Sequence, residues 1–238
     1  MPNAVCLCTS LYLKRFNLPL LRYLSQTGSV AQWEYEQEFD EPSSIEGAME
    51  LLASYLRINP EPVDLIGHGI GGLLGLLMTR RYPELVRSLT LLSVSAHPAV
   101  TWQSQYYAHR HFFQCDRHSL LVQIAYHLFG YRDADILDRL AVLLRNDLDY
   151  ALSPHSLFGQ AVISPMSCPK PLLVCGSEDD LIIGKPAIEQ WKSELKDGDR
   201  YSLFPNGRHF FHYFNAQDVG REIKKFWRSL WELQEMQS

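Results

Sequence analysis

The chain has 238 residues, of which 46% are hydrophobic and 21% are charged. This length and composition suit one α/β domain with room for a single insertion, and they disfavour two independent domains. The formal net charge is -5 and no run of Lys or Arg is longer than a pair. These features disfavour nucleic acid and anionic membrane surfaces as partners.

The N-terminal segment does not show the pattern of a secretory signal peptide, and no stretch approaches the length of about 18 apolar residues that a membrane span needs. We therefore expect a cytoplasmic protein with no membrane span. Cysteines are odd in number and form no C-x-x-C pair, so we expect reduced thiols at Cys6, Cys8, Cys115, Cys168 and Cys175.

Strand and helix patterns alternate along the chain. Apolar or alternating runs predict strands at residues 4–8, 30–38, 63–68, 88–96, 171–176 and 200–206. The pattern Ser43-Ser44-Ile45-Glu46 resembles a capping box and predicts a helix that follows it. Further helices are expected over 73–82 and near the C-terminus, where one side carries Val219, Ile223, Phe226, Leu230 and Leu233. This alternation predicts a mainly parallel sheet with helices on both faces.

The interval 97–166 interrupts this alternation. It has no convincing strand pattern, and helical patterns occur around 103–113, 119–129 and 134–148. We interpret it as a helical insertion rich in aromatic residues. The core of the domain would then consist of residues 1–96 and 167–238.

The stretch LIGHGIGG, residues 65–72, has the spacing Gly67-x-Gly69-x-x-Gly72 of a dinucleotide-binding turn. Such a turn needs an acidic residue at the end of the next strand to hold the ribose. That strand instead ends Ser-Val-Ser-Ala, and two strands precede the motif, whereas the fingerprint usually follows the first strand of its domain. We therefore reject this interpretation and expect no cofactor.

The same stretch also fits the strand-to-helix bend that carries a hydrolase nucleophile. Such a bend needs small residues two positions before and after its centre, and Gly67 and Gly71 flank Gly69 in this way. An acid and then a histidine should follow later strands in the chain. Asp179 and His209 stand at suitable places.

With these motifs in order, the chain resembles the α/β-hydrolase superfamily over nearly its whole length. The resemblance rests on VDLIGHGIGG, RRYPELVRSLTLLSVS, PLLVCGSEDDLI and FPNGRHFF. It implies that the insertion is a helical cap, that Gly69 stands where the family has Ser, Asp or Cys, and that Asp179 and His209 are the acid and the base. It also implies oxyanion donors at the Ile70 N–H and in the first-strand loop, which here reads Thr9-Ser10 instead of a His-Gly pair.

Glycine has no side chain that could attack a carbonyl, so conventional serine esterase activity is not expected. The leading hypothesis is a degenerate hydrolase whose capped, largely apolar pocket binds a small apolar or ester-like molecule, or whose surface binds a protein partner. One alternative is a hydrolase or lyase that works through His209 and Asp179 without a nucleophile at position 69. Another is a serine esterase whose nucleophile has been replaced.

Other polar residues near the predicted site have simpler interpretations. The hydroxyls of Ser10, Ser93 and Ser95 are better explained by hydrogen bonds to nearby backbone than by nucleophilic roles. His68 is expected to pack beside the bend as a pocket residue. His109 with His111, and His209 with His212, lack a further ligand that would complete a metal site, so we expect no metal.

Overall fold

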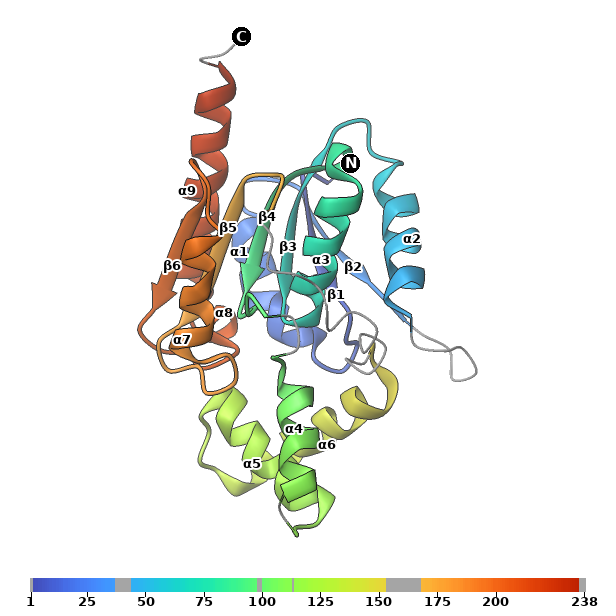
Figure 1. The fold of residues 1–238 in the computed structure, drawn as a ribbon, viewed down its shortest axis with the longest axis vertical. Helices are drawn as coiled ribbons and strands as arrows, with labels where there is room; N and C mark the ends of the chain where they lie inside the picture. Colours follow the sequence, from blue (N-terminus) through green and yellow to red (C-terminus); the bar gives the residue numbers. More distant parts are fainter. Residues whose placement is uncertain (1, 37–43, 98–99, 113, 153–167, 236–238) are drawn as a thin grey trace.

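The computed structural model describes residues 2–36, 44–97, 100–112, 114–152 and 168–235. Within them, six parallel strands form one sheet in the order β2-β1-β3-β4-β5-β6. The strands are β1 (Ala4–Cys8), β2 (Val30–Glu34), β3 (Val63–His68), β4 (Val86–Leu92), β5 (Leu172–Ser177) and β6 (Arg200–Phe204). Because every pairing is parallel, the carboxyl ends of the strands meet at one edge (Figure 1). The predicted α/β fold with a parallel sheet is confirmed.

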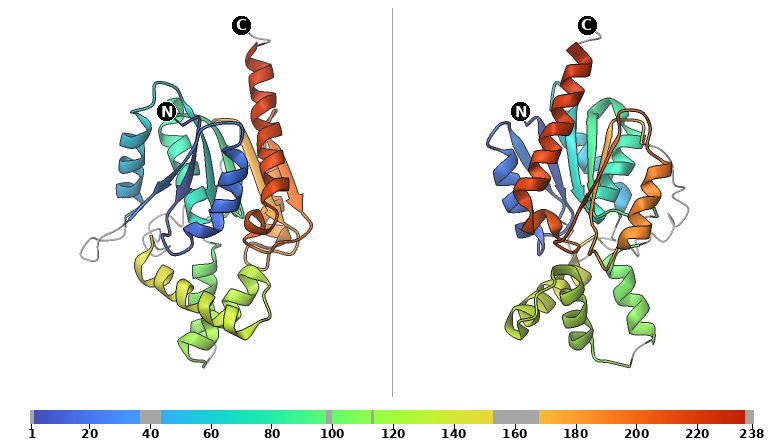
Figure 2. Two further views of the ribbon diagram at one scale, coloured as in Figure 1. Left: turned by 180° about the vertical axis from the view of Figure 1, so that it is seen from behind. Right: turned by 90° about the vertical axis from the view of Figure 1, so that its left-hand side faces the viewer.

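Helices cover both faces of the sheet. One face carries α1 (Leu18–Leu24) and α9 (Ala216–Glu235), and the other carries α2 (Ile45–Leu56), α3 (Ile70–Arg81) and α7 (Gly184–Glu189) (Figures 1 and 2). Successive strand residues point to opposite faces. Thus Cys6 and Ile66 pack in the cluster with α1 and α9, whereas Leu7 and Leu65 pack in the larger cluster with α2 and α3. Shorter helical segments are η1 (Lys14–Asn17), η2 (Pro83–Leu85), η4 (Gln190–Ser193) and α8 (Phe211–Phe214).

Three helices between β4 and β5 lie together beyond the carboxyl ends of the strands (Figure 1). They are α4 (Trp102–Phe112), α5 (Arg117–Phe129) and α6 (Ala134–Tyr150), and we call them the helical unit. Asp116 and Asp133 cap α5 and α6 by accepting backbone N–H groups of the first turn. The three helices match the helical patterns of the sequence, although residues 98–99, 113 and 153–166 of the interval lie outside the described residues.

Several element boundaries differ from the sequence-based expectation. Helix α2 begins one residue later than the proposed capping box predicts, because the N-cap residue is Ser44 and not Ser43. The Ser44 hydroxyl accepts the Gly47 N–H. Ser43 lies outside the described residues. Strand β4 ends at Leu92 and not at residue 96, because Ser93 has a positive φ of 49° that breaks the extended backbone. β2 ends at Glu34, and residues 37–38 of the predicted strand lie outside the described residues.

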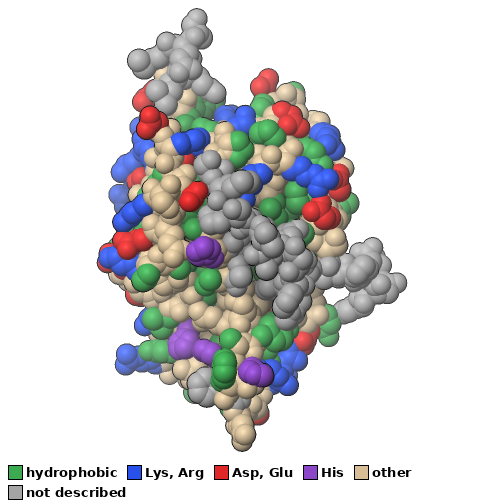
Figure 3. Space-filling model, viewed as in Figure 1, with side chains coloured by type: hydrophobic (Ala, Val, Ile, Leu, Met, Phe, Trp, Pro, Cys, Tyr) green, Lys and Arg blue, Asp and Glu red, His purple; other side chains and the backbone are tan. Residues whose placement is uncertain are grey.

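Charged side chains of both signs are interspersed over the face drawn in Figure 3, with no continuous basic patch on that face. The described helices all lack the combination of length and hydropathy that crossing a membrane requires. All five cysteines are free thiols, and only Cys115 is exposed among them.

Candidate functional site

The site is centred on a sharp bend between β3 and α3. Gly69 joins the two elements with φ 52° and ψ -121°, in a region that favours glycine. The elements approach each other so closely that a Cβ on Gly67 would lie 2.4 Å from the Cα of Gly72. A Cβ on Gly71 would lie 2.5 Å from the backbone oxygen of Leu7. Small residues on both sides of Gly69 are therefore required by the packing of strand against helix.

A cavity of about 70 Å³ opens at this bend, at the carboxyl edge of the sheet. Most of the residues predicted from sequence to form the site line it together: Thr9, Ser10, His68, Gly69, Ile70, Ser95 and His209. The parallel sheet accounts for this, since the loops after β1, β3, β4 and β6 all leave from the same edge. Asp179 does not line the cavity.

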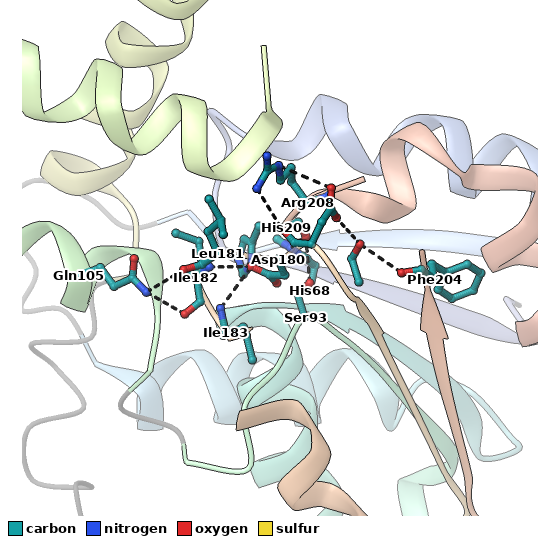
Figure 4. A network of polar contacts seen from close by, with 12 residues as sticks. His68, Ser93, Gln105, Asp180, Leu181, Ile182, Ile183, Phe204, Arg208 and His209 are labelled. Atoms are coloured by element: carbon teal, nitrogen blue, oxygen red, sulfur yellow. Dashed lines mark hydrogen bonds and ion pairs between the residues drawn. The ribbon is translucent and has the colours of Figure 1, made fainter. Parts of the chain in front are cut away.

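The acidic partner of His209 is Asp180, and the predicted pairing with Asp179 is wrong. His209 Nδ1 lies 3.0 Å from Asp180 Oδ2, and 2% and 4% of these two residues remain exposed. The contact connects the loop after β5 to the loop after β6 (Figure 4). A carboxylate at Nδ1 fixes the imidazole so that Nε2 is the atom able to accept a proton.

Asp179 is held outside the cavity by its own contacts. Its Oδ1 accepts the Ser177 hydroxyl at 2.6 Å and the backbone N–H of Arg208 at 2.8 Å. About a third of its side chain is exposed, beside the Arg208 guanidinium. Asp179 therefore links the loops after β5 and β6, one residue before the carboxylate that faces His209.

The environment of Asp180 favours its ionised form. Burial alone would raise the pKa of this carboxyl, but the charge and hydrogen bond of His209 and the backbone N–H groups of Ile182 and Ile183 lower it. The net pKa lies below the ordinary value for aspartate. Asp180 is consequently a buried carboxylate at neutral pH.

The backbone of His209 is fixed by two further hydrogen bonds. Its carbonyl oxygen accepts the Ser93 hydroxyl at 3.0 Å and lies 3.0 Å from His68 Nε2 (Figure 4). Because a carbonyl can only accept, His68 carries its proton on Nε2. Burial, followed by the nearby His212 and His209, lowers the pKa of His68 well below its usual value, so this ring is neutral.

His212 is also buried next to these rings. Its Nε2 lies 3.1 Å from Asn17 Oδ1, and burial lowers its pKa to about 3, with a smaller contribution from His209. Among the described residues, no cluster of three or more His, Cys, Asp or Glu side chains has the geometry to hold a metal ion.

The hydroxyls considered as other nucleophiles are engaged with backbone groups. Ser10 Oγ accepts the Leu13 N–H at 3.1 Å, and Ser95 Oγ accepts the His97 N–H at 3.0 Å. Ser93 donates to His209 as described above. The structure shows these hydroxyls supporting the loops around the cavity.

Two polar residues of the helical unit, not singled out from the sequence, also line the cavity. Asp147 of α6 and Gln103 of α4 are buried there, and Gln103 Nε2 donates to Asp147 Oδ2 at 3.2 Å. A signal was present for Asp147. It continues the spacing of Leu137, Leu140 and Leu144 along the apolar side of α6, where a carboxylate is unusual.

Comparisons with known proteins show the family and the fold of the chain. Residues 27–222 match the model of the Alpha/beta hydrolase family. The uncharacterized protein alr2406 of Nostoc sp. is 40% identical over 236 residues, which cover 99% of this chain and 94% of that protein. The uncharacterized protein sll0249 of Synechocystis sp. is 42% identical over 218 residues, which cover 92% of this chain and 87% of that protein.

A solved structure with the same fold is that of a lipase-esterase related protein from Clostridium acetobutylicum. It is 20% identical and superposes with a TM-score of 0.65 over 94% of each chain. An identity this low supports the fold and no particular activity. The family match over most of the sequence, together with the parallel sheet and the bend at Gly69, shows that the chain belongs to the alpha/beta hydrolase family.

Proposed function

We propose that this protein keeps the α/β-hydrolase architecture without covalent catalysis and binds a small ligand in the cavity beside Gly69. In this proposal Gly69 occupies the position at which other members carry the nucleophile. The helical unit α4–α6 acts as a cap over the cavity. The Ile70 N–H and the Thr9–Ser10 loop stand where oxyanion donors would be expected.

The observation that carries the proposal is the placement of Gly69 and His209 in one cavity. A residue other than glycine at this bend would be strained by about 1 to 3 kcal/mol, a cost that active members of such families accept in order to expose a nucleophile. Glycine avoids most of this strain and offers no atom for attack. Glycine at position 69, in place of a nucleophile, therefore favours stability of the fold over acyl transfer.

The dimensions and lining of the cavity support a small, partly apolar ligand. A volume of about 70 Å³ holds roughly five water-sized groups. Apolar lining residues include Leu7, Leu13, Leu73, Val94 and Phe210. A short ester-like or otherwise largely apolar molecule would match this space.

The first test is the hydrolysis of p-nitrophenyl acetate and butyrate. We expect the wild-type rate to be close to the background of the buffer, and His209→Ala to leave it unchanged, because position 69 supplies no nucleophile. A substrate-dependent rate that disappears in His209→Ala would contradict the proposal.

The second test is to restore a nucleophile with Gly69→Ser. A Cβ at position 69 would meet no atom within 4 Å, so the serine has space and only backbone strain opposes it. If the remaining site is intact, we expect esterase activity at least about tenfold above that of the wild type. Adding Asp180→Asn should then remove the gain, whereas Asp179→Asn, next to it in sequence, should remove much less.

Continued inactivity of Gly69→Ser would instead show that the oxyanion donors or the orientation of His209 no longer support the reaction. That outcome would still agree with the expected absence of esterase activity in the wild type. It contradicts the assignment of Ile70 and the Thr9–Ser10 loop as working oxyanion donors.

The buried His209–Asp180 pair favours a second candidate function. An imidazole oriented by a carboxylate can act as a general base on a bound water or on a substrate proton, without a nucleophile at position 69. A hydrolase or lyase of this kind would lose its activity in His209→Ala, and also in Asp180→Asn. The first test therefore distinguishes the two candidates once a substrate is turned over.

A further inference from the structure

The helical unit brings a buried acid and a buried amide to the cavity. Asp147 lies near the end of α6 with 2% of its surface exposed, and Gln103 lies at the start of α4 with 6% exposed. They contact each other through Gln103 Nε2 and Asp147 Oδ2 at 3.2 Å. Both line the cavity that also contains Gly69 and His209.

Each of these side chains retains an acceptor atom without a partner. Within the described residues, Asp147 Oδ1 and Gln103 Oε1 are buried and have no partner at full hydrogen-bonding geometry, although the Ser10 hydroxyl lies close enough to Asp147 to lower the pKa of its carboxyl. Buried acceptors are nearly always paired, because removing them from water without a replacement donor is unfavourable. Two such oxygens from neighbouring residues indicate a place for a group that carries N–H or O–H donors.

The charge around Asp147 favours a cationic donor over a neutral one. Lys and Arg are absent from the described residues that line the cavity, where the other titratable groups are Cys8, His68 and His209. Two basic residues of neighbouring segments have acidic partners at the surface, since Arg117 of α5 pairs with Asp149 and Lys14 pairs with Glu34. Among the residues that the structure describes, the carboxylate of Asp147 forms no ion pair.

We propose that the cavity binds a small molecule carrying a protonated amine, whose N–H groups are accepted by Asp147 Oδ1 and Gln103 Oε1. This inference rests on the proposed ligand-binding function and names the chemistry of the ligand. The apolar lining residues would contact a short hydrocarbon portion of the same molecule. The amine would supply both the missing donors and the missing positive charge.

Burial makes the proposed contact dependent on pH. Desolvation raises the pKa of Asp147 to about 6, against the smaller opposing effects of the Ser10 and Gln103 side chains. Cys8 stays protonated, since burial raises its pKa to about 12, and His68 stays neutral because burial lowers its pKa. Between pH 7.5 and pH 5 an alkyl amine remains charged, while Asp147 changes from mostly ionised to mostly protonated.

The experiment compares n-butylamine with n-butanol, a neutral molecule of similar size, in NMR titrations of the full chain. At pH 7.5 we expect butylamine to bind at least about tenfold more tightly than butanol. At pH 5 its affinity should fall about tenfold, because roughly one molecule in ten then has Asp147 ionised. Asp147→Asn should abolish the preference for the amine and retain the binding of butanol.

Asp149→Asn provides the matched control, because Asp149 lies on the same helix but at the surface, paired with Arg117. It should keep both the preference and its pH dependence. A fall in amine affinity at pH 5 that persists in Asp147→Asn would arise from another group, and would overturn the role of Asp147. The comparison of butylamine with butanol in the wild-type protein at pH 7.5 tests the inference independently of how well the variant folds.

Equal binding of the two probes at pH 7.5, or binding of neither, would overturn the inference. Equal binding in the cavity would leave the proposed ligand-binding function standing. Conversely, ester hydrolysis dependent on His209 would contradict the proposed function even if the amine preference were found.

Discussion

Asp147 places a carboxylate in a part of the cavity where it is poorly hydrated. Its pKa is raised from 3.8 to about 6, chiefly by burial, so ionisation disfavours the folded state by about 2 to 3 kcal/mol. Because the folded pKa lies above the unfolded one, this penalty is absent below pH 3.8, grows between pH 3.8 and 6, and is complete at higher pH. A charge kept under such conditions is consistent with a role in binding.

Asp147→Asn should accordingly stabilise the protein at neutral and alkaline pH. We expect urea denaturation to show a gain of about 2 kcal/mol in the free energy of unfolding at pH 8 and almost none near pH 4. The new amide could also donate to the unpaired Gln103 Oε1. Asp149→Asn should change stability little at either pH. A gain of equal size at both values would show that the effect does not arise from ionisation.

The sequence could not predict which of Asp179 and Asp180 faces His209. Both carboxylates follow β5, and the order of motifs requires only that an acid stand near this place. Which one faces inward is decided by contacts across the fold: Asp179 accepts the Arg208 N–H, while Asp180 accepts those of Ile182 and Ile183. These partners become neighbours only after the chain has folded.

The packing of β3 against α3 sets how much space each glycine of the bend has. A Cβ on Gly67 would meet backbone atoms of Gly71 and Gly72 at 2.4 to 2.5 Å, and neither element can move without disturbing the sheet. A Cβ on Gly69 would meet no atom within 4 Å and suffers only from the positive φ. The two glycines are therefore required for different reasons.

We expect Gly67→Ala to lower the free energy of unfolding by about 3 kcal/mol, through overpacking. Gly69→Ala should lower it by about 1 to 2 kcal/mol, through backbone strain. Gly28→Ala is the control, because its Cβ would also meet no atom within 4 Å and its φ is not positive. Chemical denaturation of the three variants measures the order of these losses in the free energy of unfolding. A loss at Gly69 equal to that at Gly67 would contradict the steric argument.

At the scale of whole elements, the sequence was most informative where a strand is buried on both sides. The apolar runs at β1, β3 and β5 predicted these strands, because a central parallel strand packs against helices on both faces. Boundaries were harder to predict. The positive φ of Ser93, which ends β4, is stabilised by the bond from its hydroxyl to His209, more than a hundred residues later.

For the molecule as a whole, the order of three motifs predicted the architecture, and most of the site residues predicted with it line one cavity. This worked because a parallel sheet collects the carboxyl ends of its strands at one edge, whatever the details of packing. How the helical unit contacts the core was not predictable. Gln105 of α4, for example, donates to the backbone oxygen of Ile182 at 2.7 Å, and no sequence pattern connects these positions (Figure 4).

The stability of the whole molecule in acid depends on groups with opposite effects. Protonation of Asp147 relieves a penalty as the pH falls towards 3.8. The lowered pKa values of His68 and His212 have the opposite effect on stability. Below pH 6.5 these histidines bind protons in the unfolded chain but stay neutral in the folded protein, which favours unfolding. Asp180 adds to this loss as the pH falls below its ordinary pKa. Between pH 6.5 and 4.5 the two histidines outweigh Asp147, so the protein should lose stability over this range, and Asp180 should add to the loss only at lower pH.

His212→Gln isolates the contribution of one buried histidine to this loss of stability in acid. His212 has a folded pKa of about 3 against an ordinary value of 6.5, so keeping it neutral at pH 4.5 lowers the free energy of unfolding by about 2 to 3 kcal/mol. Glutamine retains an N–H for Asn17 and does not titrate. From pH 6.5 to 4.5, urea denaturation should show that the variant loses about 2 to 3 kcal/mol less than the wild type, whatever its stability at neutral pH. His97→Gln, at an exposed position, should follow the wild-type curve. If the His212→Gln and wild-type curves run parallel, the buried ring is not a source of acid sensitivity.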